Sequence, residues 1–127
     1  NMVITIKKIY YDNYVEVSSP HGVFCGNYFG KNICIGKKCD VEFEIPKVFA
    51  LHDFEISDIQ AFNIVASNGI IKIRGLVHEI DNDVIFLRFG LDLISIEIVA
   101  DVDYKSLLNK YVTVTFDKIV LYDTGAF

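Results

Sequence analysis

Hydrophobic and polar residues alternate with a period of two over much of the chain, and β-branched and aromatic residues are frequent. This alternation is typical of strands with one buried face, because successive side chains of a strand point to opposite sides. The clearest case is residues 40–45, where Val41, Phe43 and Ile45 share one face, and Asp40, Glu42 and Glu44 share the other. The pattern therefore predicts a strand-rich chain with little helix.

Turn-forming residues divide these strands into hairpins. Asn68-Gly69 is the strongest turn signal, because both residue types tolerate the positive φ of a two-residue hairpin turn, and strands are expected at 61–66 and 70–80. With turns at 81–83 and 90–92, the stretch 59–99 is predicted to form a four-strand meander. A first hairpin is expected from 2–9 and 14–18. Gly75 is expected to mark a corner within its strand.

The rest of the chain is less regular. Residues 23–29 are expected to form a strand, and 47–57 a crossing loop with one turn of helix near 48–52. Asp103 is expected to cap a short helix that extends to Lys110, and short strands are expected at 111–116 and 119–122. Eight to ten short strands with one short helix predict an all-β fold, either an antiparallel barrel of the oligonucleotide/oligosaccharide-binding (OB-like) type or a β-sandwich.

Length and charge narrow the choice of class. A chain of 127 residues without a visible internal repeat predicts a single domain over 1–127. Residues 1–39 carry five lysines against Asp12 and Glu16, a charge of +3, whereas residues 40–127 carry −8. An acidic surface of this size opposes binding to nucleic acid or to an anionic membrane and favours a basic partner. The absence of a long apolar run or a secretory segment predicts a cytoplasmic protein.

No pattern of an enzyme or a metal site is present. Cys25, Cys34 and Cys39 lack the paired spacing of zinc ligands, although His21 lies four residues before Cys25. Glu42 and Glu44 satisfy the same-face rule for a carboxylate pair, but such residues usually face solvent. The sequence contains neither a G-x-S-x-G nucleophile turn nor a phosphate-binding G-x-x-x-x-G-K loop. We therefore expect a non-catalytic protein without metal or cofactor.

Carboxylates gather between positions 40 and 58, with three phenylalanines among them: Phe43, Phe49 and Phe54. Such a surface suits a basic active site that grips phosphate, because complementary charge speeds the encounter and an aromatic anchor slows dissociation. The candidate partner-binding residues are Asp40, Glu42, Glu44, Asp53, Glu55, Asp58 and Phe54.

An alternative is a barrel module that binds nucleic acid or a small ligand. Small barrels bind single strands by stacking bases on aromatic side chains beside a basic groove. The lysine-bearing first third of the chain contains suitable aromatics, namely Tyr10, Tyr11, Tyr14, Tyr28 and Phe29. The charge of −8 in the remaining residues opposes this alternative, because it repels phosphate.

The chain is small, acidic and β-rich, and its overall type can be compared with known protein families. The segments that carry this comparison are 40–45, 83–88 and the closing 110–123. The chain resembles the small acidic immunity proteins of bacterial toxin systems, including those of contact-dependent growth inhibition. The resemblance implies a non-enzymatic cytoplasmic protein that binds one cognate toxin domain, a basic nuclease, and covers its active site or substrate groove. These proteins share no common functional residues, so the resemblance assigns no site by position.

Overall fold

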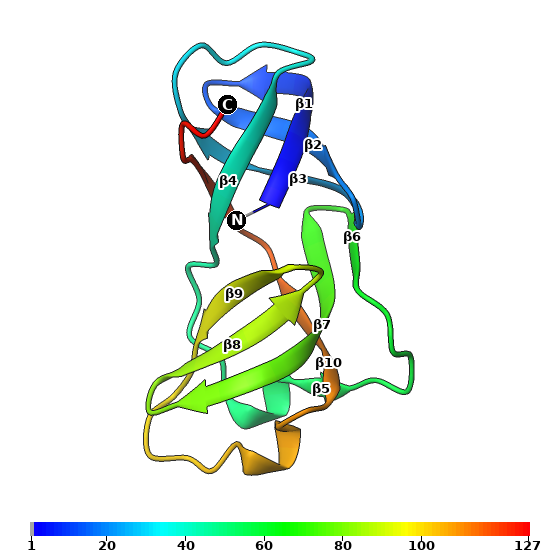
Figure 1. Cartoon of the computed structure of the whole chain (residues 1–127), viewed down its shortest axis with the longest axis vertical. Helices are drawn as coiled ribbons and strands as arrows, with labels where there is room; N and C mark the ends of the chain where they lie inside the picture. The colour runs from blue at the N-terminus through cyan, green and yellow to red at the C-terminus, as the bar shows by residue number, and fades with distance from the viewer. Residues whose placement is uncertain (1) are drawn as a thin grey trace.

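A computed structural model describes residues 2–127 and is almost entirely β (Figure 1). The strands are β1 Met2–Tyr11, β2 Tyr14–Ser19, β3 Gly22–Phe29, β4 Lys38–Glu44, β5 Glu55–Ile56, β6 Asn63–Ser67, β7 Ile70–Asp81, β8 Val84–Phe89, β9 Asp92–Glu97, β10 Tyr111–Phe116 and β11 Val120–Asp123. Two 3-10 turns, η1 Leu51–Asp53 and η2 Lys105–Leu107, complete the described elements. No helix within residues 2–127 has the length and apolar character to cross a membrane.

The first half of the molecule is a closed barrel with the strand order β1-β2-β3-β11-β4. The last strand, β11, runs parallel to β3 and antiparallel to β4, and β4 closes the barrel by pairing with β1. A five-stranded Greek-key barrel of this order is the arrangement of OB-type domains. The predicted all-β barrel is thus confirmed.

The second half is a sheet with the order β5-β10-β7-β8-β9, and β6 pairs with the first part of β7. It contains the predicted meander from β6 to β9. The helix expected after Asp103 is wrong in extent, because only η2 forms before β10 starts at Tyr111. Asp103 nevertheless accepts a hydrogen bond from the Lys105 N–H, at 2.8 Å.

Two local predictions are confirmed at the residue level. Asn68 and Gly69 have φ values of 52° and 78°, as a two-residue hairpin turn with positive φ at both positions requires. Gly75 lies inside β7 at the point where this strand changes its partner from β6 to β8. A β-carbon on Gly75 would lie 2.7 Å from the Arg88 carbonyl oxygen, so the close approach of β8 requires glycine.

The two halves repeat the same three-strand meander, which the sequence analysis missed. Strands β2 and β3 start at Tyr14 and Gly22, and β8 and β9 start 70 residues later, at Val84 and Asp92. The buried positions keep the same offset, so that Val15 and Val17 of β2 correspond to Ile85 and Leu87 of β8. No residue of 14–29 is identical to its counterpart in 84–99, and the repeat is therefore invisible in the residue identities.

Each half is completed by a segment that follows the fourth strand of the other half. In the first half β11, which follows β10, lies between β3 and β4. In the second half the segment after β4 forms a parallel bridge from Phe49 to Ile98, beside β9, and then pairs through β5 with β10. The chain thus exchanges the closing strand between its two halves.

The buried side chains form one hydrophobic cluster that draws on both halves. Phe24 and Tyr28 of β3 and Ile94 of β9 belong to it, as do Phe49 and Leu121 of the exchanged segments. A shared core and exchanged strands support the expected single domain, which remains a prediction.

Candidate functional site

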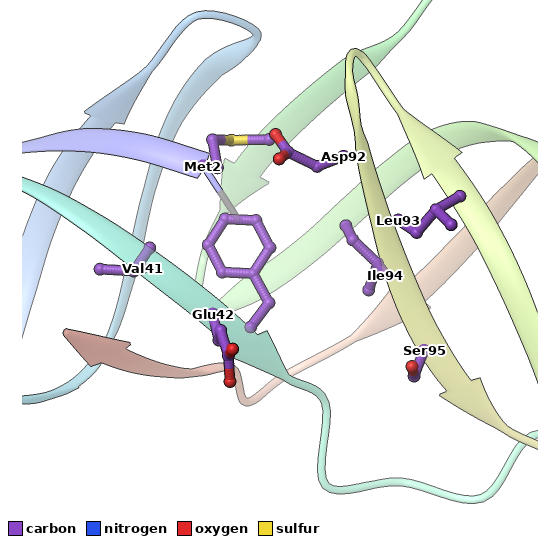
Figure 2. Close-up of a pocket in the computed structure, with 8 residues that line it drawn as sticks. Met2, Val41, Glu42, Asp92, Leu93, Ile94 and Ser95 are labelled. Atoms are coloured by element: carbon purple, nitrogen blue, oxygen red, sulfur yellow. The ribbon is translucent and has the colours of Figure 1, made fainter. Parts of the chain in front are cut away.

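Two adjoining hollows lie between β4 of the first half and the β8–β9 hairpin of the second half. Their volumes are about 290 Å³ and 560 Å³, and both are lined by Glu42, Phe43 and Ser95. We call the combined feature the acidic groove, because five carboxylates line it: Glu42, Glu44, Asp83, Asp92 and Glu97. Figure 2 shows its narrower part, with Glu42 on β4 and Ser95 on β9 at opposite walls.

Strand alternation sets the chemistry of both walls. On β4, Val41 is buried while Glu42 and Glu44 are exposed. On β9, Ile94 and Ile96 are buried while Leu93, Ser95 and Glu97 are exposed. Each strand therefore turns its apolar face to the core and its polar face outward. The groove combines carboxylates with the exposed apolar surface of Leu93, which is 50% exposed.

The electrostatic character of the groove is uniformly negative. No lysine, arginine or histidine is among the described residues that line it. The Tyr122 hydroxyl donates to Glu44 Oε2 at 3.3 Å, and its ring stacks on Phe29 with 5.7 Å between centroids. Desolvation of the Tyr122 hydroxyl, with the Glu44 carboxylate beside it, raises the pKa of Tyr122, so it remains a hydrogen-bond donor at neutral pH. A cationic side chain is the natural complement of this groove.

The structure divides the predicted acidic residues between two places. Glu42 and Glu44 line the acidic groove, and Asp40 lies on the same strand, where its carboxylate accepts a hydrogen bond from Thr124 Oγ1 at 2.8 Å. Glu55 and Asp58 lie in and just after β5 of the second half and do not line the groove. The six predicted carboxylates therefore do not form one surface.

Two of the predicted partner-binding residues have structural roles. Phe54 is buried and packs on Phe49 and Tyr104, with ring centroids 5.9 Å and 6.1 Å away. It therefore belongs to the core and cannot anchor a partner from the surface. Asp53 accepts a hydrogen bond from the Ala50 N–H at 2.8 Å, which stabilises the start of η1. The irregular stretch 47–57 gave no periodicity from which this burial could be predicted.

Sequence reasoning missed three of the groove carboxylates: Asp83, Asp92 and Glu97. They belong to the β8–β9 hairpin and its preceding turn, about 40 to 55 positions after Glu42 and Glu44. Their exposure follows from the alternation of β9, but their position beside β4 depends on the packing of the two halves. Only the acidic total of residues 40–127 pointed to them.

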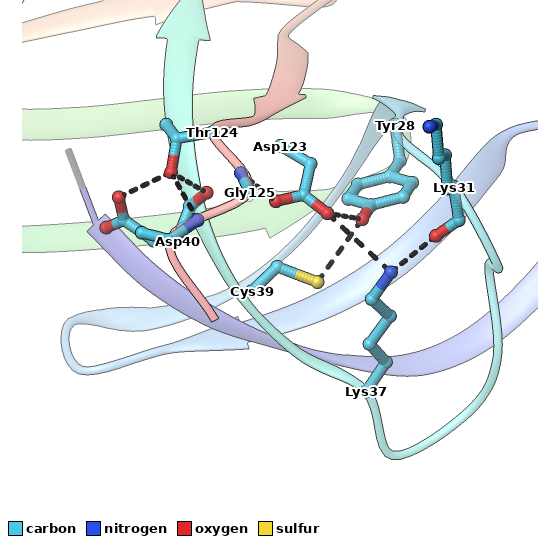
Figure 3. Close-up of polar contacts among 9 residues, drawn as sticks. Tyr28, Lys31, Lys37, Cys39, Asp40, Asp123, Thr124 and Gly125 are labelled. Carbon is cyan, nitrogen blue, oxygen red and sulfur yellow. Dashed lines mark hydrogen bonds and ion pairs between the residues drawn. The ribbon is translucent and has the colours of Figure 1, made fainter.

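A second polar cluster joins the C-terminal segment to the barrel (Figure 3). The buried Tyr28 hydroxyl donates to Asp123 Oδ2 at 2.7 Å and lies 3.3 Å from Cys39 Sγ. Lys37 Nζ lies 3.6 Å from the same Asp123 oxygen and also contacts the Lys31 carbonyl. The hydrogen bond from Tyr28 lowers the pKa of Asp123, helped by the Gly125 N–H. These contacts hold β11 in the barrel, and the polar groups of the cluster find their hydrogen-bond partners within the protein.

Aromatic side chains gather at the tip of the β1–β2 hairpin. Tyr14 stacks on Tyr11 at 5.3 Å and lies 5.9 Å from Tyr10, and Lys7 and Lys8 are exposed on the same strand as Tyr10. Tyr28 is buried instead, with 1% of its surface exposed. Tyr28 is therefore excluded from the stacking surface that the alternative function requires, whereas Tyr10, Tyr11, Tyr14 and Phe29 are accessible.

The cysteines and histidines take separate positions. Cys39 is buried, Cys25 is partly buried and Cys34 is exposed, and all three are free thiols. His21 stacks on Phe89 at 4.8 Å and meets Phe62 edge-on at 5.8 Å. Within residues 2–127, no three His, Cys, Asp or Glu side chains come together in a group that could hold a metal ion.

A wider hollow, of about 820 Å³, lies between the end of β7 and η2. Asp81, Asp101 and Asp103 line it, but Lys105 and His78 do so too. Its charge is therefore mixed. The acidic groove is the stronger candidate, because it has one sign of charge and receives walls from both halves.

Comparison of the chain with protein-family models, with curated proteins and with solved structures finds no match. The likeness of the first half to an OB-type barrel accordingly rests on strand order.

Proposed function

We propose that this chain is a non-catalytic inhibitor that binds a basic protein partner through the acidic groove. The observation that carries the proposal is the set of five carboxylates from two distant parts of the chain, gathered in one groove without a basic side chain among the described lining residues. Converging carboxylates attract a cationic surface and exclude an anionic one. An exposed apolar side chain, Leu93, offers the contact that slows dissociation.

The partner that fits this surface best is a toxin domain with a basic active site, such as a nuclease. A nuclease holds the phosphates of its substrate with lysine and arginine, and a groove of carboxylates competes for the same groups. This proposal agrees with the resemblance to bacterial immunity proteins and implies action in the cytoplasm, where such a toxin acts. It needs no catalytic residue of its own.

Affinity capture tests the proposal. Lysate of the native organism, treated with nuclease, is passed over the immobilised protein and over the variant Glu42→Lys/Glu44→Lys, and the retained proteins are identified by mass spectrometry. We expect one basic protein on the wild-type column, retained at moderate salt and depleted on the variant column, and inhibited by the wild-type protein in a nuclease assay. Equal retention on both columns would contradict a role for the groove.

The second candidate is a barrel module that binds single-stranded nucleic acid. The observation in its favour is the cluster of the exposed Tyr10 and Tyr11 with the half-buried Tyr14, near the end of the strand that carries Lys7 and Lys8, on an OB-type barrel. Under this proposal Tyr11→Ala weakens binding of an oligonucleotide by a stacking-sized amount, about 1 to 3 kcal/mol. Unchanged binding, or no binding to the wild-type protein, removes this candidate.

A further inference from the structure

The acidic groove has a counterpart in the other half of the molecule. Its wall of Leu93, Ile94 and Ser95 on β9 corresponds, at the 70-residue offset, to Val23, Phe24 and Cys25 on β3. These three residues also line a hollow, of about 260 Å³. The opposite walls differ, because the registers of β1 with β2 and of β7 with β8 put Met2 in the position of Ile73, whereas Ile71 and Asp117 line the hollow. One wall of the groove is therefore built twice.

The two hollows differ in what borders them. The hollow beside β3 is walled on one side by the tip of the β6–β7 hairpin, Ala66–Gly69. Strand β6 continues along β3, where the Ile64 N–H donates to the His21 carbonyl at 3.0 Å and the Ile64 backbone lies over Gly22. Within residues 2–127, no strand takes this place beside β9. Strand β6 thus covers the start of β3, and the corresponding start of β9 has no such cover among the described residues.

Strand β9 also presents an open backbone edge to the groove. It is the last strand of its sheet, and Phe49 covers only its far end, where the Phe49 N–H donates to the Glu97 carbonyl at 2.8 Å. Alternate residues of an antiparallel strand turn their backbone groups to opposite sides. Leu93 and Ser95 therefore point their N–H and C=O groups the same way as Glu97, away from β8. Among the described residues, none of these four groups has a backbone partner.

We propose that the acidic groove receives an extended, lysine- or arginine-bearing segment of the partner protein, which adds to β9 as a further strand. This inference rests on the proposed function and specifies its mode of binding. Backbone hydrogen bonds to Leu93 and Ser95 hold the segment, as in other cases of strand addition to an exposed sheet edge. Its side chains alternate between the two faces of the sheet, so that basic residues on the face of Leu93, Ser95 and Glu97 meet the groove carboxylates and lay their aliphatic stems on Leu93.

The variant Ser95→Pro tests the edge directly. The Ser95 N–H points outward, so proline removes a donor that the β8–β9 ladder does not use, and edge strands tolerate proline at such positions. The matched control is Ser95→Ala, which removes the hydroxyl and keeps the N–H. Far-ultraviolet circular dichroism and the unfolding midpoint verify that both variants are folded.

The probe is a fluorescent peptide of alternating lysine and valine, measured by anisotropy at low salt. We expect Ser95→Ala to bind it as the wild type does and Ser95→Pro to bind it about tenfold more weakly, the scale of one or two lost hydrogen bonds. A second test changes the peptide and uses the wild-type protein. Methylation of alternate backbone nitrogens removes the peptide's N–H donors, and we expect this peptide to lose binding.

The outcomes separate this inference from the proposed function. Equal binding of the Ser95→Pro and Ser95→Ala variants, together with equal binding of the methylated peptide, overturns strand addition, as does failure of the alternating peptide to bind at all. If the captured basic protein still depends on Glu42 and Glu44 in that case, the proposed function stands without the strand. Failure to capture any basic protein overturns the proposed function itself.

Discussion

At the scale of single residues, the Tyr28 hydroxyl ties three parts of the barrel together. Tyr28 lies on β3. Its hydroxyl contacts the thiol of Cys39 on β4 and donates a hydrogen bond to the carboxylate of Asp123 at the end of β11. Burial and the hydrogen bonds to Cys39 and Asp123 raise the pKa of Tyr28, so the hydroxyl remains protonated and keeps donating. The exchanged strand β11 is thus held in the first half by a hydrogen bond to the charged carboxylate of Asp123.

Asp123→Asn is expected to destabilise the protein at neutral pH by about 1 to 3 kcal/mol, because a charge-assisted hydrogen bond becomes a neutral one. Folding lowers the pKa of Asp123 below its ordinary 3.8, so its contribution is present above that pH and is lost as the pH falls through the folded-state pKa. Urea unfolding along an acid pH series measures the effect. The difference between wild type and variant should shrink toward low pH.

The exposed Asp58 provides the control for this series, because Asp58→Asn removes a carboxylate without a comparable buried donor. This variant should match the wild type at every pH. A difference between wild type and Asp123→Asn that persists unchanged in strong acid would contradict the assigned role of the carboxylate.

At the scale of elements, β7 performs two tasks along its twelve residues. Its first part pairs with β6 and β10, and its second part pairs with β8. Gly75 lies at the change of partner, where Leu87 and the Arg88 carbonyl approach the backbone. The absence of a side chain there allows the two pairings to share one strand.

Gly75→Ala is expected to lower the free energy of unfolding by about 1 to 3 kcal/mol, as overpacking of a tight site does. A β-carbon would meet the Arg88 carbonyl oxygen and Leu87 Cγ, both at 2.7 Å, and a backbone oxygen cannot move aside as a flexible side chain can. The unfolding midpoint in urea measures the loss. An unchanged midpoint would show that β8 does not approach β7 this closely.

Elements with a local cause were predictable from the sequence. The Asn68-Gly69 turn and the two-faced β4 follow from φ preferences and from the period of the strand, which need no knowledge of distant residues. The parallel pairing of β11 with β3 was not predictable, because Leu121 and Tyr28 are far apart in the chain and no short-range signal joins them. The burial of Phe54 and the gathering of Asp83 with Glu42 depend on the same long-range packing.

At the scale of the whole molecule, the exchanged closing segments make the two halves depend on each other. Loss of β11 opens the first barrel and also frees the chain segment that follows β10. In the same way, Phe49 and β5 connect the segment after β4 to the second sheet. Neither half has its full set of strands without the other. The molecule should therefore behave as one cooperative unit despite its two sheets.

A single unfolding transition is the expected consequence. Tyrosine fluorescence and far-ultraviolet circular dichroism should give the same midpoint in urea, and Leu121→Ala, a core truncation in β11, should shift both together by about 2 to 5 kcal/mol. Two separate transitions, with only one of them moved by Leu121→Ala, would show that the halves unfold independently.

The placement of charge is the other property of the whole molecule. The first 39 residues are basic and include the exposed Lys7, Lys8 and Lys31, whereas the groove between the halves is lined by carboxylates. This separation of charge orients an approaching basic partner toward the groove before contact. Binding through the groove thus predicts an association rate that depends on the groove carboxylates and on salt.

The association rate of the captured basic partner with matched charge-reversal variants is the most direct test of the groove. Glu42→Lys/Glu44→Lys changes two carboxylates in the groove, and Glu55→Lys/Asp58→Lys makes the same change of charge outside it. We predict that the groove variant associates at least about tenfold more slowly at low salt, and that the difference narrows as salt rises. The outer variant should stay close to the wild type. Equal slowing of both variants would mean that net charge alone governs binding, and would contradict the groove as the binding site.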